Sequence, residues 1–449
     1  MVLNLDSAAA GATIGSGHAA SGAKLAGVAD PACPGVVHVP VAADGALVRI
    51  RVPGGLISPG MLDSVARLAR DEAGGHLDVT ARANLQLRRV DPARVEVVTA
   101  KLEQAGFLPS RAHDRLRNIV INPFSGLDLS ERQDLRAAAR TLDAGLVADQ
   151  ALTVLPAKFG FVLDGGGFAF ESGAADIAFT ASEDGELLHL NLSGQKTGRG
   201  VAAGIVAEAA LVLAHAILDV SRAAGLPARS RALRGRPELV AAVLAREPRL
   251  VPCPPVALRE PAAVPFGRLE GRGQQVALVP VVALGRLTEA QVRGLASVAR
   301  EFDGEVRLAP WRGVVLIVAD RLAPAAAQRL AALDLPLGAE NGFYGLVACG
   351  DRSECNSALT DARLDAARIA RELAKRGDTE IPSGWSVQIS ACPKRCAMRR
   401  AGPLDLTAQT DGYELSMRGQ PMARGLGPET ALTAVLNAWD AARHLTENT

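Results

Sequence analysis

The sequence of 449 residues predicts a mixed α/β (α+β) fold in which one unit is present twice. Three observations predict it. Four segments of the first half recur in the second half, in the same order and at a nearly constant offset of 226 to 228 residues. Each copy opens with a helix pattern before two strand patterns, and closes with an alanine-rich helix pattern. A proline-rich stretch separates the copies.

The matching segments define the elements that we expect. "GHLDVTARANLQLRRV" (75–90) aligns with "GEVRLAPWRGVVLIV" (304–318), each as a strand, a break and a second strand. "NIVINPFSGLD" (118–128) aligns with "GLVACGDRSEC" (345–355), and "LPAKFGFVLDGGG" (155–167) with "IPSGWSVQISACP" (381–393). "EDGELLHL" (183–190) aligns with "TDGYELSM" (410–417). The closing helices are expected over 202–225 and 427–445.

These matches divide the chain into six parts. Residues 1–30 are rich in Ala, Gly and Ser and are expected to form a disordered tail. The first copy has a smaller α+β part (31–110) and a larger α/β part (111–245). The linker 246–265 is expected to lack regular structure because of its prolines. The second copy repeats the two parts over 266–338 and 339–449.

The bulk composition excludes several classes of partner. The net charge is +1, which gives no general attraction to nucleic acid or to a membrane. We find no run of about 18 apolar residues that could span a bilayer. The N-terminus lacks the basic and apolar regions of a signal peptide. We therefore expect a cytoplasmic protein with reduced thiols.

Four of the six cysteines are paired in the second copy. They form C-x5-C, a gap of 36 residues and C-x3-C: Cys349, Cys355, Cys392 and Cys396. The first copy has Asn122, Asp128 and the glycine-rich turn 165–170 at the equivalent places, so the fold itself does not require thiols there. We assign no role to the remaining two, Cys33 and Cys253.

The positions of the four thiols favour a metal centre over packing. Two buried strand patterns end at or just before a cysteine, and ligands of α/β sheets gather at such strand ends. Zinc is one candidate, although C-x5-C is a loose spacing for it. A four-thiolate iron–sulfur cluster fits better. The basic residues around the second pair suit a polyanionic cluster: Lys394, Arg395, Arg399 and Arg400.

Basic and amide side chains are concentrated in the first copy. "DVTARANLQLRR" places Thr80, Arg82, Asn84, Gln86 and Arg88 at alternate positions, which predicts one polar face of a strand. Such a face is either solvated or lines a wet cavity. Arginines bind carboxylates bidentately, so we predict a cavity for a ligand with many carboxylates between the two copies. The predicted substrate-binding residues are Arg82, Asn84, Gln86, Arg117, Lys158 and Arg312.

These motifs together resemble the sirohaem sulfite and nitrite reductases. The resemblance spans about residues 30 to 445 and rests on T-x-R-x-N-x-Q (80–86), R-N (117–118), L-P-x-K-F (155–159) and the four cysteines. It implies a duplicated nitrite/sulfite reductase-like fold, in which each copy is a ferredoxin-like half-domain followed by a larger α/β domain. It also implies that the cysteines hold a 4Fe-4S cluster.

At two places the sequence departs from the reductase motifs and resembles the precorrin-3B synthase branch of that family. Arg82, Arg117 and Lys158 match three of the residues that grip sulfite or nitrite in the reductases, but Gly160 replaces a second lysine, and the cysteine loop reads C-P-K-R-C instead of C-P-N-G-C. This branch hydroxylates the anionic tetrapyrrole precorrin-3A at C-20 with O2 and closes a γ-lactone, in aerobic cobalamin biosynthesis. It is held to use the 4Fe-4S cluster, a non-haem iron and a reduced electron donor.

Two other hypotheses about the function fit the same residues. A sirohaem-dependent sulfite or nitrite reductase that lacks one lysine is the second hypothesis, and sirohaem is a cofactor only in that case. A non-enzymatic electron carrier or a zinc-stapled binding protein is the third, and the basic strand argues against it. The iron ligands are not identified: His76 and Asp78 have part of the spacing of a 2-His-1-carboxylate site, but we do not assign them. The catalytic residues stay unknown.

Overall fold

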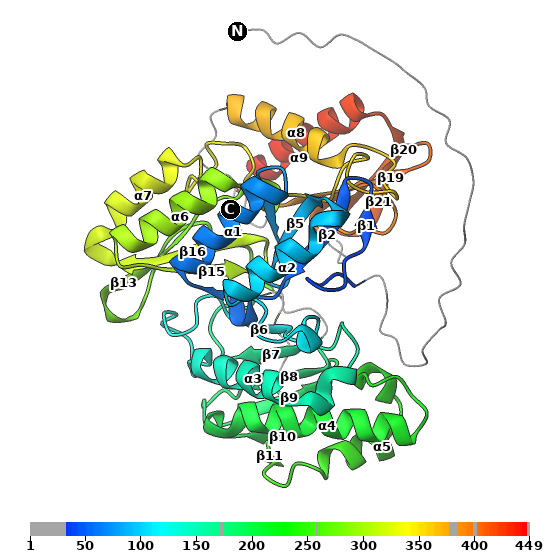
Figure 1. The fold of residues 1–449 in the computed structure, drawn as a ribbon. Coiled ribbons are helices and arrows are strands. Elements are labelled where there is room, and N and C mark those ends of the chain that lie inside the picture. The colour runs from blue at the N-terminus through cyan, green and yellow to red at the C-terminus, as the bar shows by residue number, and fades with distance from the viewer. Residues whose placement is uncertain are drawn as a thin grey trace.

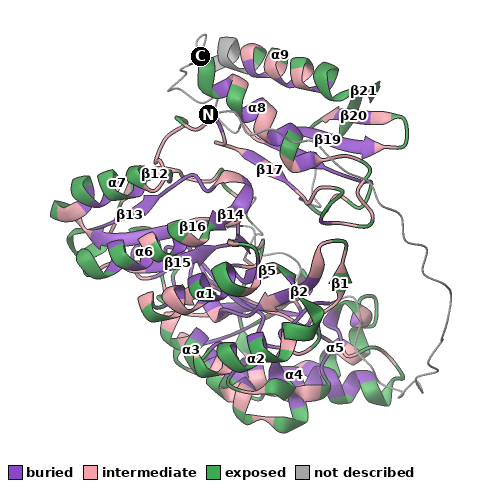
Figure 2. Ribbon diagram, turned by 45° about the horizontal axis from the view of Figure 1, so that its top comes forward, coloured by how far each residue is buried: buried purple, intermediate pink, exposed green. Residues whose placement is uncertain are grey.

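The computed structural model describes residues 33–170, 175–256, 259, 261–376, 385–397 and 402–446. The expected disordered tail, 1–30, lies outside these residues. Two half-domains occupy the middle of the molecule, and one larger α/β domain lies on each side of them (Figure 1). The sheets are largely buried, while the surrounding helices expose one face (Figure 2).

The two half-domains exchange one edge strand each. The first sheet has the order β1-β2-β5-β4-β14 and the second β12-β13-β16-β15-β3, so β14 and β3 each lie in the sheet of the other copy. The elements of the first half-domain are β1 (Val41–Ala42), β2 (Gly45–Ile50), β3 (Leu56–Ile57), α1 (Pro59–Glu72), β4 (His76–Val79), β5 (Leu85–Val90) and α2 (Val95–Gln104). Those of the second are β12 (Gly267–Glu270), β13 (Gln275–Val279), β14 (Arg286–Thr288), α6 (Glu289–Glu301), β15 (Glu305–Ala309), β16 (Gly313–Ala319) and α7 (Ala323–Ala332).

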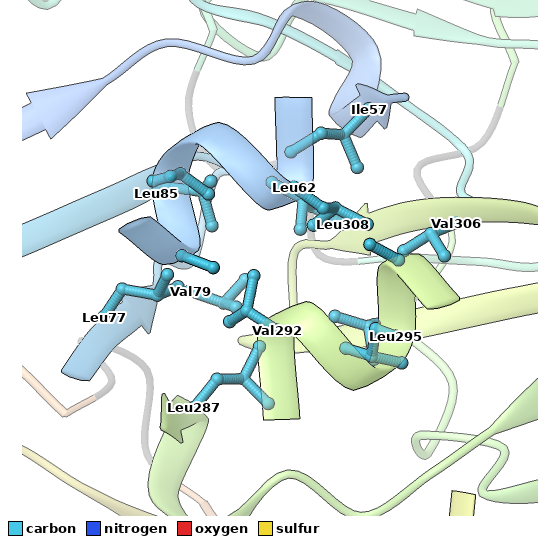
Figure 3. Packing of buried hydrophobic residues seen from close by; sticks show 14 of the residues in the cluster. Ile57, Leu62, Leu77, Val79, Leu85, Leu287, Val292, Leu295, Val306 and Leu308 are labelled. Carbon is cyan, nitrogen blue, oxygen red and sulfur yellow. The ribbon is translucent and has the colours of Figure 1, made fainter. Parts of the chain in front are cut away.

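Helices α1 and α6 pack against each other and join the half-domains in one core. Each helix starts at a side-chain cap: the Ser58 hydroxyl accepts the Met61 N–H, and Thr288 forms a capping box with Gln291. Their apolar faces share one buried cluster with strands of both sheets, which includes Leu62 and Leu295 (Figure 3). Neither half-domain therefore has a complete core of its own, and the two copies are held as one body.

The two α/β domains have the same strand arrangement. Three neighbouring strands are parallel, and the remaining strands of each sheet pair with their neighbours in antiparallel fashion. The first sheet has the order β11-β10-β9-β8-β7-β6 and the second β17-β18-β19-β20-β21. The shared arrangement confirms the predicted duplication.

The elements of the first α/β domain are β6 (Ile119–Ile121), α3 (Arg136–Ala148), β7 (Phe161–Asp164), β8 (Ile177–Ala181), β9 (Leu188–Leu192), β10 (Gln195–Val201), α4 (Val206–Ala223), α5 (Pro237–Leu244) and β11 (Val251–Pro252). Those of the second are β17 (Leu346–Ala348), α8 (Ala362–Arg376), β18 (Val387–Ser390), β19 (Leu404–Gln409), β20 (Gly412–Met417), β21 (Gln420–Leu426) and α9 (Pro428–Thr446).

Two local expectations were wrong. Residues 80–88 are not one strand: β4 ends at Val79, residues 80–84 form a turn in which the Thr80 N–H bonds to the Asn84 carbonyl, and β5 begins at Leu85. The linker contains a short edge strand, β11, where a proline is tolerated. Among the described residues, Ala203–Ala223 is long and apolar enough to cross a membrane, but half of it is buried in the protein, as in a core helix.

Candidate functional site

The four predicted cluster cysteines come from the ends of two neighbouring parallel strands. Cys349 directly follows β17, and Cys392 lies two residues after β18, which pairs with β17 in parallel. The Ala391 N–H donates to the Cys349 sulfur at 3.0 Å. Burial raises the pKa of the Cys349 thiol, the hydrogen bond from Ala391 partly offsets this, and the other three thiols raise it further. All four sulfurs are thus close enough to interact electrostatically.

Four thiols are the donor set that a 4Fe-4S cluster uses. Among the residues that the structure describes, no group of three or more His, Cys, Asp or Glu side chains is placed to bind one metal ion. A 4Fe-4S cluster is held by four thiolates on four different irons, so its ligands stand farther apart than those of one zinc ion. Cys392 is buried and Cys396 is exposed, so the site lies at the edge of the domain. The donor set fits a four-thiolate cluster.

An ion-pair network fixes the first cysteine loop to the half-domains. Arg286, on β14, binds Asp78 at 2.7 Å and Glu354 at 2.6 Å. Arg363 lies 3.4 Å from Asp78 and 3.5 Å from Glu354. Glu354 directly precedes Cys355 and is 2% exposed. The loop is therefore held by β4 of one copy and β14 of the other.

A group of arginines includes Arg312, which contacts the second cysteine loop. Arg49 lies on β2, and Arg51 directly follows the last residue of that strand. Burial, and then the positive charge of Arg51, lowers the pKa of Arg49 to about 10, and Arg82 and Arg312 add to the same shift. Four guanidinium groups are thus gathered in one partly buried region, which we call the arginine group: Arg49, Arg51, Arg82 and Arg312.

Three members of the arginine group bond to neutral oxygens. Arg49 donates to the Gln86 amide at 2.7 Å, and its buried Nε has no hydrogen-bond partner among the described residues. Arg51 donates to the Asn118 amide at 2.9 Å and the Pro34 carbonyl at 3.1 Å. Arg312 donates to the Cys396 and Ala397 carbonyls. Like charges at this density are stabilised by an anion, so the arginine group fits an anionic ligand.

The structure brings only part of the predicted substrate set to the arginine group. Gln86 is buried against Arg49. Lys158 follows Ala157, whose carbonyl accepts the Asn118 amide that also bonds Arg51. Asn84 is buried, and its side-chain oxygen accepts the Val52 N–H at 2.8 Å, which is a structural role.

Arg117 is engaged elsewhere in this conformation. It forms a two-bond ion pair with Asp143, both bonds at 2.7 Å, and donates to the Phe107 carbonyl at 2.8 Å. Both side chains line a pocket of about 170 Å³, between α3 and the ends of α1 and α2, which Arg51 also borders. The role of Arg117 in substrate binding remains a prediction.

The two half-domain sheets differ on the face that meets an α/β domain. In the second copy this face packs on the loop of the first copy that contains Phe124. It is mostly apolar, with Ala277, Val279, Val315 and Ile317, but it also carries the buried Arg307, which donates to the Pro123 and Ser125 carbonyls. In the first copy the same face carries Arg49, Asp78, Gln86 and Arg88, and Arg88 donates to the carbonyl of Glu354 in the cysteine loop. The first copy therefore has more charged and amide side chains on this face than the second.

Arg49 and Arg51 were missed from the sequence. A signal was available, because "ALVRIRV" (46–52) alternates core residues with Arg49 and Arg51 in one strand. Of the loop cations, Lys394 bonds to Ser357 and Arg395 lies 2.9 Å from Asp405, while Arg399 and Arg400 lie outside the described residues. His76 is exposed and bonds to the Gly74 carbonyl, and Asp78 is engaged by arginines, so neither supports an iron site.

Comparison with known proteins gives the same architecture. A model described as the nitrite/sulfite reductase ferredoxin-like half domain matches residues 41–105 and 269–333. The chain is 26% identical to the ferredoxin–nitrite reductase of Synechococcus elongatus, over 83% of this chain and 78% of that protein. It is also 26% identical to a precorrin-3B synthase of a Sinorhizobium species, over 86% of this chain and 83% of that protein.

A solved structure supports the fold. The NirA protein of Mycobacterium tuberculosis superposes with a TM-score of 0.68 at 20% identity, over 85% of this chain and 76% of that chain. The half-domains occur twice, at the two positions that the repeat predicts, and the relatives match across most of the chain. The chain therefore contains this half domain twice and is similar over most of its length to nitrite and sulfite reductases and to a precorrin-3B synthase, which supports an oxidoreductase.

Proposed function

We propose that this protein is a precorrin-3B synthase, which hydroxylates precorrin-3A at C-20 with O2 and closes a γ-lactone from a ring acetate. The main support for the proposal is the arginine group, of which Arg312 contacts the second cysteine loop. Four guanidinium groups in one region suit a macrocycle with several carboxylates, because each group can bind one carboxylate through two hydrogen bonds.

The residues of the arginine group would orient the substrate. The Arg49 Nε is buried and available to a ligand, and Gln86 holds its other end in place. Burial, and then the neighbouring arginines, lower the pKa of Arg49 to about 10, and an anion bound here would raise it again by offsetting the like-charge repulsion. The loop that contains Lys158 is fixed to Arg51 through Asn118 and borders the same region.

The proposed reaction needs electrons at this place. One oxygen atom of O2 enters the macrocycle, and two electrons and two protons convert the other to water. Cys349, Cys355, Cys392 and Cys396 would hold the 4Fe-4S cluster, which supplies one-electron transfer from a reduced donor when bound. The described residues show no set of ligands for a non-haem iron, so we assign it no step.

A sirohaem-dependent sulfite or nitrite reductase is the second candidate. The similarity to ferredoxin–nitrite reductases favours it, and sirohaem carboxylates would also suit the arginine group. Gly160 favours the synthase: it stands where the reductases carry a second lysine for the small anion, and it provides no cation.

The absorption spectrum of anaerobically purified protein tests the choice. The synthase should show a broad iron–sulfur shoulder without haem bands, and should convert precorrin-3A under O2 to a product one oxygen atom heavier. Sirohaem bands in the purified protein, together with unchanged precorrin-3A, would reject the synthase and support the reductase.

A further inference from the structure

Arg312 is the member of the arginine group that contacts the second cysteine loop. It lies in the turn between β15 and β16, at the end of the second half-domain sheet. One nitrogen of its guanidinium donates to the Cys396 carbonyl at 2.9 Å and to the Ala397 carbonyl at 2.8 Å. It therefore ties the end of the C-P-K-R-C loop to a different domain.

The backbone at Arg312 is in a conformation that side chains rarely adopt. Its φ is +66°, and the equivalent turn of the first copy has Ala83 at +52°. A left-handed non-glycine residue costs of the order of 1 kcal/mol, and such residues gather at functional sites. Gly285 makes room for it: a Cβ at position 285 would lie 2.7 Å from the Arg312 Cβ. The turn thus has an arginine at a position where glycine would have no backbone strain.

The guanidinium of Arg312 interacts electrostatically with one thiol of each cysteine pair, Cys349 and Cys396. Burial and the charge of Arg363 lower the pKa of Arg312, and the Asp78 carboxylate and the thiols of Cys349 and Cys396 oppose this. Its Nε is buried and has no hydrogen-bond partner among the described residues. The charge of this half-buried side chain therefore acts on any group that the thiols bind.

We propose that Arg312 is a positioning residue that fixes the C-P-K-R-C loop and raises the reduction potential of the cluster held by the four cysteines. The reduced cluster carries one more negative charge than the oxidised one, so a fixed positive charge beside it favours reduction. Net charge and hydrogen bonding near the sulfurs are among the factors that set such potentials. The inference rests on the four-thiolate site of the proposed function and holds for either candidate enzyme.

Anaerobic redox titration of the full-length holoprotein, followed by electron paramagnetic resonance of the reduced cluster, tests this role. Arg312→Gly removes the side chain and relieves the backbone strain. We expect its equilibrium constant for one-electron reduction to fall at least tenfold, which is about 59 mV. Arg418→Gly is the matched control, because Arg418 is exposed, has a φ of +48° and lies in the β20–β21 turn. Its potential should equal that of the wild type.

Two further variants separate charge from loop geometry. Arg312→Gln should have a potential as low as that of Arg312→Gly, while Arg312→Lys should restore most of the wild-type value. If the Gln and Lys variants both bind a full cluster and have equal potentials, the proposal is wrong. Iron and sulfide analysis of the wild type distinguishes failure of the proposed cluster site from failure of the role of Arg312. Wild-type protein without a cluster refutes the four-thiolate site. An intact cluster whose potential is unchanged in the Arg312 variants refutes only the role of Arg312.

Discussion

Arginine side chains in this protein differ in what neutralises them. Arg117 is neutralised by Asp143 through two short hydrogen bonds, whereas Arg49 and Arg51 bond to amide and carbonyl oxygens. The two environments have opposite consequences for a ligand. A carboxylate has to compete with Asp143 for Arg117, but it can add to the bonds that Arg49 already makes. At the residue scale, the arginine group is therefore the better candidate for anion binding.

Removal of one guanidinium from the arginine group should weaken binding of the tetrapyrrole. We expect Arg49→Met and Arg82→Ala each to cost about 1.5–3 kcal/mol of binding free energy, the value of a hydrogen bond to a charged group. Added salt should also weaken binding where the contacts are exposed. Arg418→Ala, at an exposed turn, is the control. A dissociation constant for both variants that matches the control would place the ligand elsewhere.

Single cysteine replacements test the metal site. Ser in place of Cys349, Cys355, Cys392 or Cys396 should abolish the iron–sulfur absorption and the activity, because each thiolate binds a separate iron. Cys33→Ser and Cys253→Ser should keep the cluster: the Cys33 sulfur contacts the Ala157 carbonyl, and Cys253 packs over Gly200 in the first copy. A full complement of iron and sulfide in Cys392→Ser would contradict the four-thiolate assignment.

Elements were predictable where their pattern was long, and less so where it was short. The helices α1 and α6 and the order of strands in both copies follow from periodicity and from the repeat. The alternation over 80–88 was misleading, because the Thr80 hydroxyl accepts the Asn84 N–H across a tight turn and interrupts the strand. The exchange of β3 and β14 was not predictable, since two- and three-residue edge strands leave almost no pattern.

The exchanged strand β14 should contribute to stability through Arg286. Burial opposes ionisation of Asp78, but Arg363 and Arg286 outweigh it and hold the pKa of this carboxyl below its usual value. We expect Arg286→Met to lower the free energy of unfolding by about 3 kcal/mol at pH 7, because it leaves buried carboxylates with fewer partners.

The pH dependence of this loss follows from the sign of the shift. A lowered pKa in the folded state stabilises the protein above the ordinary pKa of Asp, about 3.9, and this contribution is lost as the pH falls below it. Urea denaturation at matched iron content should thus show the two proteins converging below about pH 4. Arg268→Met, which breaks an exposed pair with Asp320, should cost less than about 1 kcal/mol. Equal losses in both variants at pH 7 would refute a special role for β14.

At the scale of the whole molecule, comparison of the two copies shows which residues are specific to the candidate site. Each half-domain sheet meets the α/β domain of the other copy; one of these contacts is mostly apolar with one buried arginine, Arg307, while the other contains a network of ion pairs. The sequence showed which copy carries the thiols and which carries the basic residues. It did not show that the charge of Arg312 acts on Arg49 of the other copy, because their proximity depends on the crossed packing of four domains.

Position 160 lies between the loop of Lys158 and β7 and distinguishes the two candidate enzymes. A Cβ placed on Gly160 would lie 3.6 Å from the Asn118 carbonyl oxygen and 3.8 Å from the Asn118 Cβ, which is ordinary contact, and its backbone is not left-handed. Gly160→Lys should therefore fold. Gly204→Lys is the control for the added charge, because Gly204 is exposed and a Cβ at this position would meet no atom within 4 Å.

The effect of Gly160→Lys depends on which reaction the protein performs. In a synthase the new cation enters space that we assign to the macrocycle or O2, so O2-dependent conversion of precorrin-3A should fall while sulfite reduction stays negligible. In a reductase it supplies the missing second cation beside Lys158, so turnover of sulfite or nitrite should rise. Two assays measure this: oxidation of reduced viologen with sulfite or nitrite, and mass detection of the oxygenated product. Wild-type protein that reduces sulfite at enzymic rates and leaves precorrin-3A unchanged would overturn the synthase, while the family fold and the cysteine site would stand.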